Sequence, residues 1–305
     1  MPLAFHSGRA FQTLETVPTP LLVSPWLAAG SITLLFGPPS AGKTHTTLAI
    51  ANALSRGASL WGVYPTVEAR VLIVQADMNT ALYQDRVRVN DIVAHDNVAI
   101  LSTDAMPMDV LTLKGTEPGV LEARLFAPDV IFVDTLRKTH NGDENDSAVA
   151  DRVYGAWRRL FPGAALVFLH HSRKLPTAAD ANRVIQEAFR GSAAWAASAD
   201  TIIAVRRVRR ANNPDWLLRL QFVRTRSCEE PAPILLQLTS DLMLTPIAST
   251  PIERTLMSHI ASHPRIKRAE AVKWLQSQLV DGKPMCSQAT AYRAWDHAVR
   301  GIGDS

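Results

Sequence analysis

The chain has 305 residues, of which 47% are hydrophobic, and this is enough for one large domain or one domain with a small appendage. A net charge of +4 is only a weak indication of an anionic partner, so the position of the charge matters more than its total. The two cysteines exclude a disulfide framework or a zinc spacing, and no segment reaches the roughly 18 apolar residues of a membrane span.

Residues 1–30 form a lead-in segment without clear periodicity, in which Trp26 is expected to pack against the core. Residues 1–16 contain no apolar run of signal-peptide length. We therefore expect a cytoplasmic protein that makes no contact with a membrane.

A glycine-rich stretch, residues 37–44, lies between an apolar run, residues 32–36, and an Ala/Leu-rich segment that can form a helix. Strand, loop, Lys-Thr and helix together are the context of a phosphate-binding P-loop, although a chance glycine turn is the alternative. Lys43 would reach the β- and γ-phosphates of ATP, and the Thr44 hydroxyl would bind Mg²⁺. The predicted nucleotide-binding residues are Gly37, Pro38, Pro39, Ser40, Ala41, Gly42, Lys43, Thr44 and His45.

Apolar segments then alternate with helical ones. The predicted strands are residues 70–77, 98–101, 130–134, 165–171, 201–205, 216–223 and 234–238, and the predicted helices are residues 80–93 and 147–160. The apolar positions expected for the first helix include Leu82, Val89 and Val93. This alternation predicts an α/β fold with a mostly parallel sheet, whose functional groups gather where the strands end.

Two acids stand at predicted strand ends. Asp134 suits a carboxylate that holds Mg²⁺ directly or through water, with an ordinary cap as the alternative. Thr135 follows it instead of a glutamate, so another strand end must supply the base that activates water. Asp77 is the best-placed candidate, and Glu144 is the alternative.

The chain resembles the RecA-type ATPases of the RepA plasmid-helicase group, AAA-domain proteins related to KaiC and DnaB. The resemblance covers about residues 20–240 and rests on segments that occur in the family's order: Leu34–Thr44, Val74–Asp77, Asp134–Arg137 with Gly142–Asn145, Leu169–Ser172 and Arg190–Ser192. It implies a RecA-like P-loop NTPase that assembles as a ring, a hexamer in our expectation, with ATP sites between subunits.

The same resemblance assigns roles to single residues. Asp77 takes the place of the family's catalytic glutamate and is one methylene shorter, which allows slow hydrolysis. Arg86 matches an arginine that contacts the nucleotide site from the following helix. His170 or His171 would sense the γ-phosphate, and Arg190 would lie at or near the subunit interface.

The segment Phe222–Arg226 resembles the strand from which ring helicases reach into a neighbour's active site. Arg224 and Arg226 are two residues apart and share a face, so both are candidates for stabilising charge on the transferring phosphoryl group. A plain charged edge strand is the alternative. The densest basic region, Arg206–Arg210, leads into a predicted hairpin turn at residues 212–215 and suits a solvated or nucleic-acid-facing edge.

Two long loops, residues 137–145 and 172–190, stand where RecA-like proteins carry DNA-contacting loops. Arg173 and Lys174 would then face single-stranded DNA in the pore of the ring, with a solvated loop as the alternative.

From residue 250 the pattern predicts a small all-α domain of three helices: one that starts at Thr250, one over residues 267–279 and one capped by Ser287. It resembles a helix-turn-helix or winged-helix domain without a wing, with Gln288, Thr290 and Arg293 facing a major groove. A small bundle that packs on the ATPase or on a partner is the alternative.

The predicted domains are thus residues 1–30, 31–240 and 250–305. We expect a ring-forming ATP-hydrolysing DNA motor of the replicative-helicase type. A DNA-stimulated ATPase of recombination or replication loading is the first alternative. A DNA-binding regulator switched by nucleotide is the second.

Overall fold

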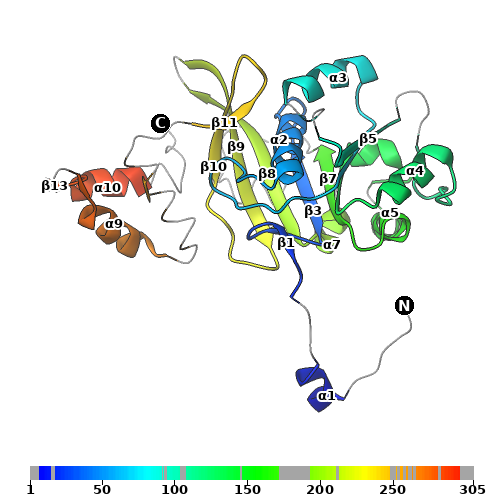
Figure 1. The fold of residues 1–305 in the computed structure, drawn as a ribbon, viewed down its shortest axis with the longest axis horizontal. Helices are drawn as coiled ribbons and strands as arrows, with labels where there is room; N and C mark the ends of the chain where they lie inside the picture. The colour runs from blue at the N-terminus through cyan, green and yellow to red at the C-terminus, as the bar shows by residue number, and fades with distance from the viewer. Residues whose placement is uncertain are drawn as a thin grey trace.

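The computed structural model describes residues 7–14, 18–90, 92, 95–103, 108–144, 146–171, 193–210, 213–247, 267–280 and 283–295, with six further positions between 252 and 266. A nine-stranded sheet lies at its centre, in the order β11-β10-β9-β8-β3-β7-β6-β4-β5 (Figure 1). Its parallel part consists of β3 (Ile32–Gly37), β4 (Val71–Gln75), β5 (Val98–Ser102), β6 (Val130–Asp134), β7 (Ala165–His171) and β8 (Thr201–Arg210).

An antiparallel extension continues the sheet beyond β8. It consists of β9 (Asn213–Thr225), β10 (Ile234–Leu238) and β11 (Leu244–Pro246). The sheet therefore reaches six residues past the predicted boundary at residue 240. Residues 213–215, predicted as part of a turn, already belong to β9, and Asn213 pairs with Arg210 of β8. The α/β fold with a mostly parallel sheet is confirmed.

Helices cover both faces of the sheet and enclose two hydrophobic clusters. One face carries α2 (Lys43–Arg56) and α3 (Thr80–Val89), and the other carries α4 (Pro118–Phe126), α5 (Ser147–Leu160) and α7 (Ala193–Ser198). Strands β3, β4 and β6 are apolar along nearly their whole length because both of their faces are covered.

The predicted apolar face of α3 is wrong. Leu82 is 63% exposed and Val89 is 37% exposed, whereas Tyr83 and Val87 are buried. Tyr83 and Val87 are four residues apart and so share one side of the helix, which is the side that packs on the sheet. Val93 lies outside the described residues.

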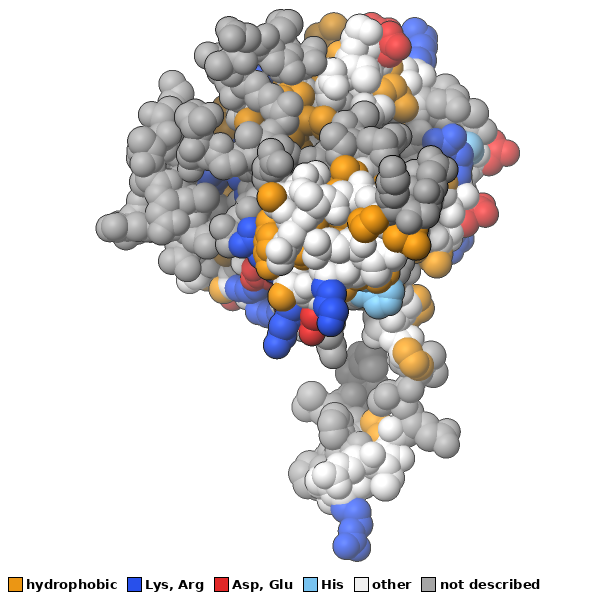
Figure 2. Space-filling model, turned by 90° about the vertical axis from the view of Figure 1, so that its left-hand side faces the viewer, with side chains coloured by type: hydrophobic (Ala, Val, Ile, Leu, Met, Phe, Trp, Pro, Cys, Tyr) orange, Lys and Arg blue, Asp and Glu red, His pale blue; other side chains and the backbone are white. Residues whose placement is uncertain are grey.

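The lead-in segment contains regular structure that its proline-rich sequence did not predict. The strands β1 (Leu21–Val23) and β2 (Leu27–Ala28) pair with each other, and Trp26 between them is 2% exposed, as its expected packing requires. A short helix, α1 (Gly8–Gln12), precedes them and stands away from the body in both Figures 1 and 2.

The last elements have a core of their own. They are α9 (Arg268–Ser277), a two-stranded hairpin of β12 (Leu279–Val280) and β13 (Lys283–Pro284), and α10 (Gln288–Trp295). Leu256, Val272, Leu275 and Trp295 pack together in that core. The prediction of an all-α domain is wrong at Leu279, which pairs in the hairpin instead of extending α9. Among the described residues, no helix combines the length and the apolar character that crossing a bilayer requires.

Candidate nucleotide-binding and catalytic site

The P-loop joins the end of β3 to the start of α2, and its backbone requires glycine at two points. A Cβ on Gly37 would lie 2.2 Å from the Val205 carbonyl oxygen of the neighbouring strand β8. Gly42 has φ +93° and stands against Leu218 of β9, so a side chain there would be both strained and blocked. The loop is therefore packed tightly onto the sheet before α2 begins.

Lys43 is held inside this loop. Its ammonium donates hydrogen bonds to the carbonyls of Gly37 and Pro38, each at 2.9 Å, and lies 3.3 Å from His171 Nδ1. Burial lowers the pKa of Lys43 to about 8, against the opposing effect of Asp134 and Asp77, so the amine remains largely charged at neutral pH.

His171, the last residue of β7, is the histidine that contacts the P-loop lysine. Because an ammonium only donates, His171 Nδ1 must accept, which places the ring proton on Nε2. Burial, followed by the nearby Lys43 charge, lowers the pKa of His171 and favours this neutral form. The ring thus has an N–H available for a phosphate oxygen.

The residues predicted to hold Mg²⁺ meet at the same edge of the sheet. Thr44 Oγ1 donates to Asp134 Oδ2 at 2.8 Å, which joins the start of α2 to the end of β6. Burial raises the pKa of Asp134 to about 6, although the Thr44 hydrogen bond opposes this shift. A buried carboxylate beside a hydroxyl is an oxygen donor pair that fits Mg²⁺ with its remaining positions filled by water and phosphate. Among the described residues, no group of three or more His, Cys, Asp or Glu side chains is arranged to hold a metal ion.

Asp77 lies two residues beyond the end of β4, on the exposed side of this edge. Its charge acts on Lys43, Asp134 and His171, which places it within the same electrostatic environment. Strand β4 pairs in parallel with β6, with Gln75 opposite Asp134, so the two acids emerge from neighbouring strands. The structure therefore brings the predicted base and the predicted Mg²⁺ ligand together.

Two residues of α3, Tyr83 and Arg86, interact electrostatically with Asp134, the predicted Mg²⁺ ligand. Arg86 is half-buried, and its charge acts on both Asp134 and His45. His45 is buried beside the Leu242 backbone, and burial followed by Arg86 lowers its pKa to about 4. Sequence reasoning missed Tyr83, which is buried and has its pKa raised by burial and by Asp134. The spacing of Tyr83 from Arg86 and Val87 was the signal that could have found it.

His170 belongs to a second cluster, with Glu144 and Trp195. It lies 5% exposed, with Nδ1 3.9 Å from Glu144 Oε1 and its ring 6.4 Å from that of Trp195. Trp195 donates from Nε1 to the Glu144 carbonyl, and the His140 ring stacks on it at 5.3 Å. Neighbouring residues on a strand point to opposite faces, which explains why the two histidines lie in different environments. The sequence did not decide whether His170 or His171 senses the γ-phosphate, and it gave no indication of Trp195.

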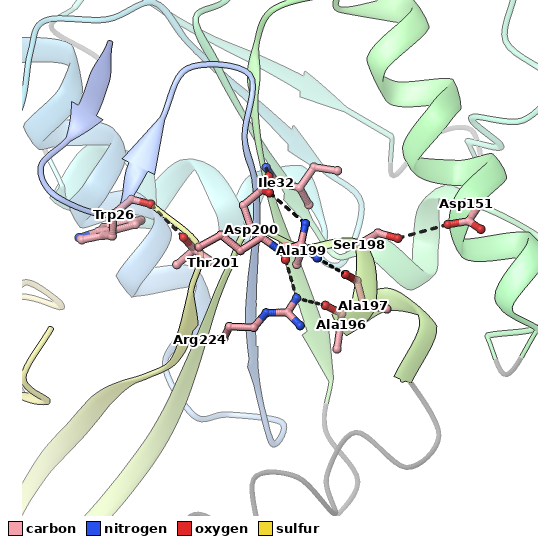
Figure 3. Close-up of polar contacts among 11 residues, drawn as sticks. Trp26, Ile32, Asp151, Ala196, Ala197, Ser198, Ala199, Asp200, Thr201 and Arg224 are labelled. Atoms are coloured by element: carbon pink, nitrogen blue, oxygen red, sulfur yellow. Dashed lines mark hydrogen bonds and ion pairs between the residues drawn. The ribbon is translucent and has the colours of Figure 1, made fainter. Parts of the chain in front are cut away.

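Arg224, shown in Figure 3, and Arg226 both bind the end of α7 in their own chain. Arg224 donates to the carbonyls of Ala196 and Ala199, and Arg226 donates to the Ala197 carbonyl at 2.6 Å. Both stand beside Asp200, which accepts from the Ile32 amide at the start of β3. The P-loop follows the other end of β3, about 17 Å away for a strand of this length. Neither arginine therefore reaches the P-loop of its own chain.

The remaining predicted residues divide into two groups. Arg173, Lys174 and Arg190 lie outside the described residues. Gln288 is exposed at the first position of α10, and Ser287 caps this helix by accepting from the Thr290 amide at 3.2 Å. Arg293 lies within α10, and its side chain is outside the description.

A match to one protein family agrees with this geometry. No curated protein matches the chain. Among solved structures, the flagellar accessory protein FlaH from Methanocaldococcus jannaschii is similar with a TM-score of 0.48 and 13% identity, over 72% of this chain and 91% of that one. A sequence model described as AAA domain matches residues 5–177, which include the P-loop, Asp77 and Asp134. Because this match spans more than half of the chain, the protein belongs to this AAA-domain family and has the RecA-like P-loop ATPase fold.

Proposed function

We propose that this protein hydrolyses ATP with Mg²⁺ and uses the energy to move along DNA, as a ring of the RepA plasmid-helicase type. The observation that carries the hydrolytic part is the convergence of Lys43, Thr44, Asp134 and Asp77 at one edge of the sheet. When bound, Mg²⁺ neutralises charge on the β- and γ-phosphates.

The chain's own residues supply the other functions. Lys43 binds the phosphates from within the P-loop. His171 donates its Nε2–H to a phosphate oxygen, which is the sensing role expected of one of the two histidines. Asp77 orients the attacking water and accepts its proton. Its exposed position and short side chain predict slow hydrolysis.

The position of Arg224 and Arg226 favours the ring. Both lie at the edge of the sheet opposite to the P-loop, so they could act on ATP only across an interface with a second copy. The resemblance to ring helicases supplies the expectation that this second copy belongs to a hexamer on single-stranded DNA.

ATP turnover and ATP binding by point variants test the hydrolytic site. Lys43→Ala should lose both ATP binding and turnover, because the ammonium that neutralises the β- and γ-phosphates is lost. Asp77→Asn should keep ATP binding and lose roughly 10²–10⁴-fold in turnover, because an amide cannot accept the proton of the water. Asp77→Glu should keep or raise the rate.

Exposed residues of the same type supply the controls. Lys273→Ala on α9 and Asp85→Asn on α3 should behave as the wild type. Normal turnover by Lys43→Ala would remove the P-loop assignment. Normal turnover by Asp77→Asn would move the base elsewhere, with Glu144 as the next residue to replace.

The separate core around α9 and α10 favours a second candidate, a DNA-binding regulator that is switched by nucleotide. In that case Gln288 and Thr290 at the start of α10 would read duplex DNA. Strand displacement driven by ATP distinguishes the motor from the regulator and also from a DNA-stimulated ATPase of replication loading. A fixed duplex sequence preference without strand displacement would favour the regulator.

A further inference from the structure

The hairpin formed by β8 and β9 extends beyond the P-loop edge of the sheet. Val205 stands against Gly37 at the end of β3, so residues 206–210 of β8 continue past it. Strand β9 returns from Asn213 and pairs along this extension, with Arg210 opposite Asn213. Five residues of strand correspond to about 15 Å, so the hairpin projects well past the end of β3 (Figure 1).

This projecting end carries a large share of the positive charge. Residues 206–219 contain five arginines and one aspartate, so their formal charge of +4 equals that of the whole chain. The rest of the chain is therefore neutral overall. A charge concentrated on one hairpin indicates an anionic partner at that place far better than the net charge alone.

Two of these arginines face each other across the strands. Arg206 is the direct register partner of Arg219, an arrangement in which like charges repel. Burial and the charge of Arg219 lower the pKa of Arg206. Within the described part of the chain, Arg206 Nε and Nη2 are buried and have no hydrogen-bond acceptor. Because Arg206 and Arg219 as whole residues are only half-buried, an anion with several oxygens placed against their exposed part would reduce the repulsion.

The other face of the hairpin has a different contact. The Arg207 guanidinium lies 4.2 Å from the centre of the Trp216 ring, and Arg207 itself is exposed. A flat cation stacked on an aromatic ring is a surface on which a base can stack, and an acidic peptide offers no such group.

We propose that the projecting end of the β8–β9 hairpin binds the backbone of a single-stranded nucleic acid, with phosphates at Arg206 and Arg219 and a base at Arg207 and Trp216. This site uses residues outside the two segments expected to contact DNA, residues 137–145 and 172–190. It rests on the proposed function, because it is a further contact for the DNA on which the motor moves. Its position next to Gly37 would let the strand respond to changes at the P-loop.

The test measures binding of fluorescent (dT)30 by anisotropy, from 50 to 300 mM salt, with the full-length protein. Arg206→Gln/Arg219→Gln should weaken binding about tenfold at 100 mM salt and lower the slope of log K against log salt by about 1.4, because two phosphate contacts are lost. Arg207→Gln should weaken it by a smaller factor. Arg206→Lys/Arg219→Lys keeps both charges and should retain most of the affinity.

The matched control is Arg158→Gln/Arg159→Gln, which removes two exposed arginines of α5 and should leave the salt slope unchanged. Thermal melting of each variant confirms folding. If the wild type binds (dT)30 but the hairpin and control variants weaken equally, the hairpin assignment is overturned and the DNA motor stands. If the wild type hydrolyses ATP but does not bind (dT)30, the result contradicts both the hairpin site and the proposed DNA motor. Displacement of the DNA by polyglutamate at equal charge would overturn the choice of nucleic acid over an acidic protein.

Discussion

His170 and His171 are adjacent in sequence but occupy different environments. His171 accepts from Lys43 at the edge of the nucleotide site, whereas His170 is enclosed with Glu144 and Trp195. Burial, followed by the charges of His171 and Lys43, lowers the pKa of His170 to about 4. The folded protein therefore holds this ring in its neutral form.

A pH dependence of stability follows from the burial of His170. Its pKa is about 4 in the folded protein, against about 6.5 in the unfolded chain. As the pH falls from 6.5 to 4, the unfolded chain takes up a proton that the folded protein does not. Stability should decrease by up to about 3 kcal/mol over this range, and the contribution is fully present only above pH 6.5.

Urea unfolding at pH 7.5 and 4.5 measures this contribution. The wild type should lose more stability between the two pH values than His170→Gln, which cannot bind the proton. The exposed His263→Gln is the control and should follow the wild type. An equal loss in the wild type and in His170→Gln would show that other groups carry the pH dependence.

The helix α7 illustrates how a short element is kept in place by its neighbours. It has only six residues, too few for stability on its own, and Arg224 and Arg226 satisfy carbonyls at its carboxyl end. Tyr154 of α5 donates to the Trp195 carbonyl at 3.0 Å. Ser198 donates to Asp151 at 3.2 Å (Figure 3). This helix connects Glu144, near His170, to the start of β3.

Arg224→Ala should lower the free energy of unfolding by about 1.5–3 kcal/mol, because a charged donor to two helix carbonyls is lost. Arg224→Lys should recover part of this stability. The measurement is urea unfolding in the absence of nucleotide, with the exposed Arg158→Ala as control. Full stability together with lost ATP turnover would assign Arg224 to catalysis alone and contradict its role in holding α7.

Within one subunit, the P-loop is far from the two arginines, Arg224 and Arg226, that could complete its active site. Lys43 and Arg226 stand at opposite ends of β3, so a single subunit cannot bring them together. A ring resolves this separation, because the P-loop edge of one subunit then adjoins the arginine edge of the next. Hydrolysis should consequently depend on assembly.

Mixing two inactive variants tests this dependence. Lys43→Ala keeps the arginines, and Arg226→Ala keeps the P-loop. An interface between them should restore part of the turnover, and the wild type's specific activity should increase with protein concentration. Arg226 is preferred to Arg224 for this experiment because it is more exposed. Turnover by a monomer at constant specific activity would contradict a shared site, as would co-assembled variants that remain inactive.

Local patterns were sufficient for much of the fold. Apolar runs of five to seven residues predicted the central strands, since a strand buried on both faces must be apolar throughout. The P-loop was recognisable because its glycines, lysine and threonine act within eight consecutive residues. The carboxylates were predictable for a related reason, because parallel strands bring their ends to one edge.

Other features depend on contacts between segments that are distant in sequence. The exposed Leu82 and the buried Tyr83 of α3 have similar apolar character, and only packing on the sheet decides which faces inward. Likewise, Leu279 leaves the helix because a partner strand is available in β13.

The sequence by itself determined the nucleotide-binding loop, the acids at the strand ends and the α/β order, because these follow from residue type and short-range spacing. Only the tertiary structure decided that His171 contacts Lys43, that Arg224 and Arg226 hold α7, and that Arg206 faces Arg219. These pairings join residues that are between 13 and 128 positions apart. Their geometry is set by strand order and register, which no local pattern encodes.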